Sequence, residues 1–290
     1  MNVTPIRTAW VFALALALAG GARAEDYHAS VDVKAGGKLE VDLSNGSLVI
    51  ETHDAPRVEV EASAPGWPAG WSFELTGDGA DAKLEGSRAF WLPGPEARVR
   101  VRVPREYSLE LRTTGGGIEI EAVRGSVDAR TSGGSIALDG ASGDVELRTS
   151  GCEIRVADLH GKTELRTSGG PINARNVQGR IEAFTSGGPI RLAEIAGEAE
   201  ARTSGGDISV RFAAPPAGEL RTSGGSIDVV IPPGTGAELD ARTSGGRVEI
   251  DGALSLAGER DSTRAQGKLG PGGQRLELQT SGGNIEIRTR

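Results

Sequence analysis

A short segment recurs along the chain and restricts the folds that this sequence can adopt. Each copy reads Arg-Thr-Ser-Gly-Gly, or a close variant, followed by four residues in which apolar and polar side chains alternate. The threonines of these copies are Thr113, Thr131, Thr149, Thr167, Thr185, Thr203, Thr222, Thr243 and Thr280. The first five steps between them are each 18 residues long. A fixed period of this size is typical of a solenoid, in which each coil buries its apolar face against the next coil.

Every repeat holds two alternating segments, with Ser-Gly-Gly between them on one side and a looser glycine-containing turn on the other. Counted from the threonine as position zero, positions −4, −2, +5 and +7 are mostly apolar, as Ile136 and Leu138 illustrate. Strand side chains alternate between two faces, so these four columns point inward. The sequence therefore predicts an all-β fold, a parallel β-solenoid (β-helix) with two strands in each coil of ~18 residues. Right-handed coils are expected from the usual crossover of parallel strands.

Two outward-facing columns carry opposite charges. Position −3 is acidic in all nine repeats, and position −1 is Arg in seven of them. Side by side, such rows neutralise each other, which predicts a solvated surface; the alternative is a flat zwitterionic surface that binds a repeating polymer such as a glycan. Phe184 occupies an Arg position in the middle of the row. We expect it to lie between Arg166 and Arg202 in cation–π contacts, with a sugar-stacking platform as the alternative.

The two glycines of each turn are expected to have different roles. The first, at position +2, is Gly in all nine repeats and Asn45 in an earlier segment that fits the same columns. Both residue types tolerate a left-handed backbone, so a positive φ is predicted at this position. These structural turn glycines are Gly115, Gly133, Gly151, Gly169, Gly187, Gly205, Gly224, Gly245 and Gly282. The second glycine is replaced once, by Cys152, so it should need only small size, and Gly133→Ala should destabilise the protein more than Gly134→Ala.

Cys152 is the single cysteine, which rules out a disulfide within the chain. We expect it to be a small buried or turn residue, with an exposed reactive thiol as the alternative.

The first 24 residues resemble a secretory signal peptide. Arg7 supplies a basic start, a short apolar run follows from Ala9 to Gly20, and Ala22-Arg23-Ala24 fits a cleavage site after Ala24. The apolar run is short for a membrane anchor, and no second one follows, so no stable membrane span is expected after cleavage. The pattern predicts a periplasmic or secreted protein.

The remaining chain divides into two parts. Residues 25–108 are predicted to form degenerate coils, interrupted at 63–97 by an insertion that contains Trp67, Trp71 and Trp91. A solenoid needs an atypical end unit to cover its open core, and clustered aromatic side chains suit that role. Residues 109–290 are predicted to form the regular solenoid, with a polar excursion at 251–274. The final coil is expected to end in an exposed strand edge that carries Arg288 and Arg290. Edge-on self-association at this strand edge is left open.

Charge and motif content argue against several functions. Cleavage after Ala24 would remove Arg7 and Arg23 and change the net charge from −8 to −10. An acidic chain disfavours DNA, RNA or an anionic membrane as a partner. The turn serine recurs in every coil, unlike a catalytic nucleophile, and the three histidines match no triad or metal-ligand spacing. We therefore expect that the protein is not an enzyme and that it binds no cofactor or metal. A polysaccharide lyase or hydrolase is a remote alternative.

The segments GGKLEVDLSNGSLVIE (36–51), RVRVPREYSLELRTTGGGIEI (100–120) and the repeated RTSGGxIxV together resemble the bacterial DUF4097 family. Members of that family are called adhesins and are similar to DUF2807 head domains. The resemblance covers roughly residues 30–290. It implies a β-solenoid on the outer side of a bacterial envelope, supplies no catalytic residues, and includes relatives linked to envelope-stress systems.

The expected function is that of a non-catalytic adhesion or glycan-binding module. The alternative is a structural or regulatory envelope protein that acts through a protein partner, with the segment 63–97 as its contact. The candidate binding residues are Phe184, Arg166, Arg202, Trp67, Trp71 and Trp91.

Overall fold

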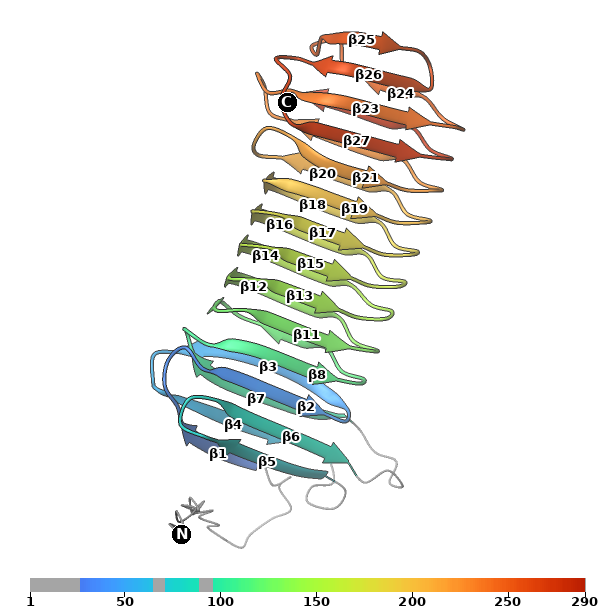
Figure 1. Ribbon diagram of the computed structural model, residues 1–290. Coiled ribbons are helices and arrows are strands. Elements are labelled where there is room, and N and C mark those ends of the chain that lie inside the picture. The colour runs from blue at the N-terminus through green and yellow to red at the C-terminus, as the bar shows by residue number, and fades with distance from the viewer. Residues whose placement is uncertain (1–26, 65–70, 89–95, 290) are drawn as a thin grey trace, which may run out of the picture.

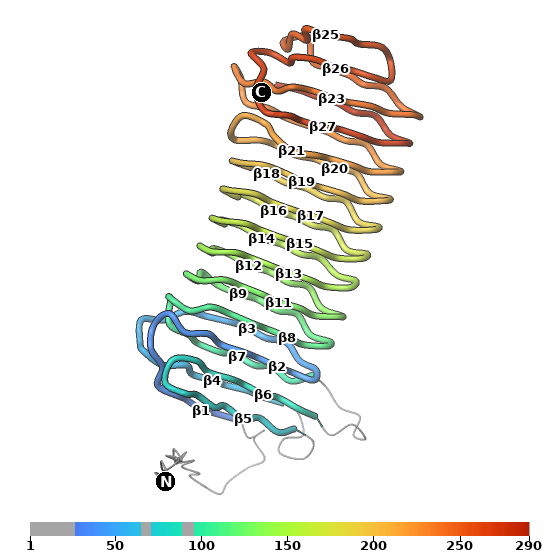
Figure 2. The backbone as a smooth tube through the Cα atoms, viewed as in Figure 1, coloured from blue at the N-terminus to red at the C-terminus, as the bar shows by residue number. Residues whose placement is uncertain are grey.

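The computed structural model describes residues 27–64, 71–88 and 96–289, and these ranges contain 28 strands and no helix. The strands form two sheets that face each other along one long axis (Figure 1). The smooth backbone trace in Figure 2 shows the coils stacked one above another. The predicted all-β parallel solenoid is confirmed. The proposed signal peptide at 1–24, Trp67, Trp91 and Arg290 lie outside the described residues.

Sheet A contains, in spatial order, β1 (Tyr27–Asp32), β4 (Arg57–Ser63), β7 (Ala97–Pro104), β3 (Gly46–His53), β9 (Ile118–Ile120), β12 (Ile136–Ser142), β14 (Ile154–His160), β16 (Ile172–Gln178), β18 (Ile190–Ala196), β20 (Ile208–Phe212), β22 (Ile227–Ile231), β28 (Ile285–Thr289) and β24 (Val248–Ile250), with β10 (Val123–Arg124) beside β12. Sheet B contains, from the opposite end, β25 (Leu256–Arg260), β26 (Arg264–Leu269), β23 (Ala237–Thr243), β27 (Arg275–Thr280), β21 (Ala217–Arg221), β19 (Glu198–Arg202), β17 (Ile181–Phe184), β15 (Thr163–Arg166), β13 (Val145–Arg148), β11 (Val127–Thr131), β8 (Ser108–Thr113), β2 (Lys38–Leu43), β6 (Ala82–Arg88) and β5 (Trp71–Gly77).

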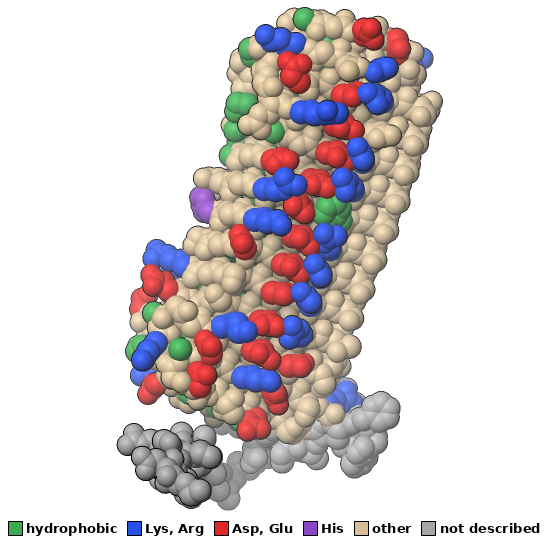
Figure 3. Space-filling model, in the orientation of Figure 1, with side chains coloured by type: hydrophobic (Ala, Val, Ile, Leu, Met, Phe, Trp, Pro, Cys, Tyr) green, Lys and Arg blue, Asp and Glu red, His purple; other side chains and the backbone are tan. Residues whose placement is uncertain are grey.

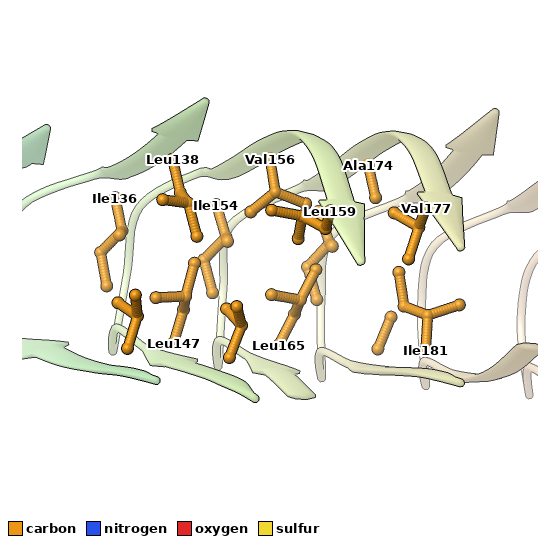
Figure 4. Close-up of a cluster of buried hydrophobic side chains, with 14 of the residues drawn as sticks. Ile136, Leu138, Leu147, Ile154, Val156, Leu159, Leu165, Ala174, Val177 and Ile181 are labelled. Carbon is orange, nitrogen blue, oxygen red and sulfur yellow. The ribbon is translucent and has the colours of Figure 1, made fainter. Parts of the chain in front are cut away.

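The central coils stack in perfect register. In sheet B, Arg148 pairs with Arg166, Arg166 with Phe184, and Phe184 with Arg202, so equivalent positions form continuous columns. The four apolar columns predicted from the repeat are buried, as Leu147 and Ile154 show with no exposed surface. Figure 4 shows these side chains pointing toward one another from the two sheets. At ~10 Å between facing sheets, one layer of Leu, Ile, Val and Ala fills the interior.

A fifth inward column was not predicted. It contains Ala141, Leu159, Val177 and Ile195, all buried. The strand bends one residue before each of them, because Gly140, Asp158, Asn176 and Glu194 have φ values of 87°, 57°, 52° and 56°. A left-handed residue breaks the strict alternation of a strand, and it turns the next side chain inward.

The left-handed positions therefore lie elsewhere than predicted. None of the nine glycines at position +2 has a φ in the left-handed region. Besides the column just described, the positive φ values between Leu109 and Val210 fall in the looser turn, at Gly143, Gly161, Gly179 and Gly197. The prediction for position +2 is thus wrong: Gly and Asn tolerate this conformation but do not require it.

The second glycine, at position +3, is the one that sterically constrains the coil. Its amide lies against the preceding coil, so that an ideal Cβ built at Gly134 would be 2.1 Å from the carbonyl oxygen of Gly116. The carbonyl oxygen at this position also accepts a hydrogen bond from the buried threonine of the next coil, as from Thr185 Oγ1 to Gly170 at 3.0 Å. The same threonine oxygen accepts the Gly188 N–H at 3.3 Å. The Thr column therefore links each turn to its neighbour.

The two ends of the solenoid are built out of sequence order. At the C-terminal end, β27 and β28 lie between the coil of β21 and β22 and the coil of β23 and β24. The antiparallel strands β26 and β25 then cover sheet B. The prediction that the chain's last coil forms the open edge is wrong, because both of its strands have neighbours on both sides. The outermost strands there are β24 and β25.

The N-terminal end has a similar arrangement. The coil of β2 and β3 lies between the coil of β6 and β7 and the coil of β8 and β9. Strands β1, β4 and β5 then add antiparallel pairs to the two sheets. Because the end coils pair on both sides, the regular core is covered by strands at both ends.

Candidate binding groove

The outer face of sheet B carries the two charged rows predicted from the repeat. Figure 3 shows an acidic row beside a basic row along this face, with a hydrophobic group within the basic row. Four of the Arg side chains bridge successive coils, as Arg148 does: its Nη2 lies 2.9 Å from Glu146 and 3.0 Å from Glu164. These side chains are part exposed, so each pair contributes little, about 0.2–1 kcal/mol. Their main effect is to cancel the repulsion within each row.

Phe184 interrupts the Arg row without leaving an acidic side chain unpaired. Glu182, which would have faced an Arg at position 184, is bound instead by Arg180 at 2.9 Å. Arg180 also contacts Glu198 at 2.7 Å and Glu200 at 3.0 Å. The hydrogen bond to Glu182 raises the pKa of Arg180. Arg180 therefore supplies the missing positive charge from the far side of the acidic row.

The guanidinium groups of both neighbouring coils contact the Phe184 ring. The Cζ atom of Arg166 lies 4.5 Å from the ring centre and that of Arg202 lies 5.8 Å from it. The predicted cation–π arrangement is present. Because a coil flanks the ring on each side, Phe184 offers its edge rather than an open face, which disfavours a sugar-stacking platform.

A groove runs along this interruption. It has a volume of about 510 Å³. One wall is the −1 column and the other is the exposed turn serines, with the buried threonines between them. We call it the Arg–Ser groove, and it is lined by Arg166, Thr167, Phe184, Thr185, Ser186, Arg202, Thr203, Ser204, Arg221, Thr222, Ser223, Gln279 and Ser281.

The groove brings together two positions that lack Arg. Phe184 and Gln279 stand on either side of the pair formed by Arg202 and Arg221, because Gln279 pairs with Arg221 in the neighbouring strand. Sequence reasoning missed this proximity, since Gln279 follows Arg242 in the chain. No local signal reveals it, because the inserted coil has the same columns as the coils on either side.

The described aromatic residues of the predicted insertion, Trp71 and Phe73, do not join this groove. Trp71 is 6% exposed and stacks on Phe73, with ring centres 5.5 Å apart and ring planes 3° from parallel. Tyr27 packs on the same Phe73 ring, with 5.6 Å between centres. Trp71 is thus part of the core at the N-terminal end. The two other tryptophans of the insertion lie outside the described residues.

A second groove on the same face is acidic. Its volume is about 290 Å³, and its lining includes Glu110, Asp128, Glu146 and Glu164. The hydrogen bond from Lys38 lowers the pKa of Glu110, and the one from Arg166 lowers the pKa of Glu164. Both carboxyl groups are therefore held in the ionised state. Within the described ranges, no group of three or more His, Cys, Asp or Glu side chains is placed to hold a metal ion.

The comparison with known families matches this architecture. The sequence model of the family described as Toastrack DUF4097 matches residues 28–288. This chain belongs to the Toastrack DUF4097 family. The match confirms the resemblance to DUF4097 and covers the solenoid together with both of its ends. No curated protein matches the chain.

Solved structures similar to this Toastrack chain share little sequence with it. A "putative adhesin" from Bacteroides fragilis is 14% identical, with coverage of 92% of this chain and 97% of that chain and a TM-score of 0.38. A "putative adhesin" from Parabacteroides distasonis is 11% identical, with coverage of 91% and 97% and a TM-score of 0.41. A "putative lipid binding protein" from the same species is 10% identical, with coverage of 91% and 96% and a TM-score of 0.34. Similarity at this level transfers no function to the chain.

The described ranges contain no helix, and so no apolar helix that could span a membrane is found in them.

Proposed function

We propose that this Toastrack protein is a non-catalytic binding module of the cell envelope, secreted or periplasmic, that holds an extended glycan in the Arg–Ser groove. The observation that carries the proposal is the groove itself, formed where Phe184 and Gln279 replace Arg. The leader-like residues 1–24 support a location outside the cytoplasm.

The groove suits a linear polymer because it repeats. Each of its five coils presents one −1 side chain. In four of the five coils, an exposed serine lies across the groove from that side chain. Neighbouring coils lie ~4.8 Å apart, so five coils span ~19 Å. This spacing is close to the length of one sugar unit in an extended glycan. Backbone hydrogen bonds fix every coil, so little conformational entropy is lost when a ligand binds.

The side chains of the groove favour binding over hydrolysis. Glycosidases need two carboxyl groups at the scissile bond, one of them protonated at working pH. No carboxylate lines the Arg–Ser groove. In the neighbouring acidic groove, the pKa values of Glu110 and Glu164 are lowered, opposite to the shift that a general acid needs.

The test is a glycan array probed with the purified wild-type protein and two variants. Phe184→Arg restores the Arg row and fills the middle of the groove, and Phe184→Ala removes the ring that separates Arg166 from Arg202. We expect the wild-type protein to bind extended glycans and both variants to bind them at least about tenfold more weakly. Arg148→Phe, a change in the same column outside the groove, is the matched control and should retain binding.

Two results would count against the proposal. One is an array on which the wild-type protein binds no glycan, and the other is unchanged binding by folded Phe184→Arg protein. A protein partner whose binding depends on Trp67 or Trp91 would instead favour the structural or regulatory alternative. Turnover of any polysaccharide would contradict the non-catalytic part of the proposal.

A further inference from the structure

We propose that the Arg–Ser groove selects glycans that carry carboxylate groups along the chain. This inference rests on the proposed glycan-binding function and adds the chemical class of the ligand. It follows from three features of the groove: unused guanidinium donors, the absence of carboxylates from its lining, and a hydroxyl row opposite the guanidinium groups.

The guanidinium groups of the groove keep N–H donors that no protein group uses. Arg166 donates one hydrogen bond, from Nε to Glu164 at 2.6 Å, which leaves both terminal nitrogens without a hydrogen-bond partner among the described residues. Arg202 bonds Glu219 through Nε and Nη2, and Arg221 bonds Glu277 through Nη2. Their Nη1 atoms are without a hydrogen-bond partner within the same described ranges. A carboxylate is the natural partner of such charged N–H donors, and Arg166 offers both of its terminal nitrogens to it.

The acidic row does not border this groove. The side chains of the −3 column are only about a sixth to a quarter exposed there, as the values of 16% for Glu200 and 26% for Glu219 show. They lie on the far side of the guanidinium groups, and Arg180 holds Glu182 on that side as well. The groove lining thus contains three Arg side chains and no acidic side chain. A carboxylate in the groove would meet donors first.

The opposite wall is made of hydroxyl groups. Ser186, Ser204 and Ser223 are exposed and recur once in each coil, directly across from the −1 column. Serine hydroxyls both donate and accept hydrogen bonds, as sugar hydroxyls do. A sugar unit with one carboxylate and several hydroxyls therefore finds guanidinium donors on one side and hydroxyl partners on the other, repeated every ~4.8 Å.

The net negative charge of the chain limits which anions can bind. Charges more than about 8 Å away are largely screened at about 0.15 M salt, so a short ligand inside the groove experiences mainly the local Arg side chains and the Glu side chains paired with them on the far side. A long, stiff polyanion such as a nucleic acid would also pass the acidic rows and ends of the protein. The inferred ligand is thus an acidic oligosaccharide or a local segment of an acidic polysaccharide.

The experiment compares one oligosaccharide in two charge states. Isothermal titration calorimetry at about 0.15 M salt would use an oligogalacturonate with about one sugar for each coil, and the same oligomer with its carboxylates converted to methyl esters. We expect the acid form to bind at least about tenfold more tightly than the ester, as hydrogen bonds to charged groups are worth more than neutral ones.

A pair of double variants locates the effect. Arg202→Gln with Arg221→Gln removes two guanidinium groups from the groove, and Arg130→Gln with Arg148→Gln removes two from the same column outside it. The first variant should lose the preference for the acid form and the second should keep it. Thermal denaturation of both variants shows whether each is folded, and their matched loss of ion pairs controls for stability.

The outcomes separate the two proposals. Equal affinity for the acid and the ester would overturn carboxylate selectivity while leaving glycan binding in place. Carboxylate selectivity would also be overturned if the protein bound neutral glycans on the array but did not bind oligogalacturonate. Loss of the acid preference in the Arg130/Arg148 variant alone would also overturn the inference, because it would place the selectivity outside the groove.

Discussion

Gly134 packs directly against the carbonyl group of Gly116 in the coil before it: a Cβ at position 134 would lie 2.1 Å from that oxygen. A methyl group added at position 134 would therefore force the two coils apart. We therefore expect Gly134→Ala to lower the free energy of unfolding by about 2 kcal/mol or more, as overpacking does in cores. At Gly133 the corresponding distance is 3.1 Å, and φ is not left-handed, so Gly133→Ala should cost less. Urea denaturation of both variants measures the difference.

This order is the reverse of the one that the sequence predicts, so the experiment discriminates between the two accounts. Gly187→Ala and Gly188→Ala repeat the comparison three coils away, with distances of 3.7 Å and 2.1 Å. A larger loss at 133 than at 134, or equal losses in both pairs, would contradict the packing argument.

Cys152 occupies the crowded position in one coil, and its turn is displaced. In five other coils the first turn glycine donates to the coil before it, as Gly133 does to Thr114 at 3.0 Å and Gly169 to Ser150 at 3.2 Å. Among the hydrogen bonds of the described residues, Gly151 makes no such bond, and a Cβ at Gly151 would have no atom within 4 Å. Cys152→Gly should therefore let this turn close and raise the melting temperature, despite the loss of the Sγ–H bond to Gly133. A lower melting temperature would show that the thiol contributes more than the crowding costs.

Thr163 is a polar residue in an apolar column. It stands between Val145 and Ile181, has no exposed surface, and its hydroxyl has no hydrogen-bond partner among the described residues. A buried hydroxyl without a partner destabilises a fold. We expect Thr163→Val, which keeps the shape, to stabilise the protein by about 1 kcal/mol. Thr163→Ser is the control that keeps the hydroxyl and should not stabilise. A destabilised Val variant would indicate a partner for this hydroxyl.

The ion-paired acidic row should make stability depend on pH in the acid range. Hydrogen bonds from Arg166 and Arg221 hold the pKa values of Glu164 and Glu277 below the ordinary value of 4.5. The unfolded chain then binds more protons than the folded one in acid, so this stability is present above about pH 4.5 and is lost as pH falls through the lowered values. Melting temperatures measured from neutral pH downward should fall in that window. The fall should be shallower in Glu164→Gln, and an unchanged melting temperature down to about pH 3 would contradict the assignment.

Much of the regular solenoid can be predicted because every coil repeats the same physical solution. The inward columns, the paired charged rows and the contacts of Phe184 with Arg166 and Arg202 all follow from strand alternation and a fixed period. The left-handed bend falls on Gly140, Asp158, Asn176 and Glu194: the first three are residue types that adopt a positive φ readily, but Glu194 is not, so the column gives no uniform signal. Without that bend, the sequence does not reveal why Leu159 points inward.

The order of the end coils was missed for a different reason. Gln279 has Arg242 beside it in its column in either arrangement, but it has Arg221 beside it only when its coil lies between those of Arg221 and Arg242. Local propensity and column chemistry fit both arrangements, and only the whole structure distinguishes them. The extent of the Arg–Ser groove depends on that choice, so the sequence indicates Phe184 as a candidate but not the second interruption at Gln279.

The most direct test of the central claim is to locate a bound glycan on the protein. Backbone amide signals would be followed by NMR while the tightest-binding glycan from the array is titrated into the isotope-labelled protein. The account predicts saturable shifts at Ser186, Ser204 and Ser223, with little change at the equivalent Ser132 and Ser150 outside the groove. Shifts centred on other coils or on the N-terminal strands β1 and β5, with Ser204 unchanged, would contradict it.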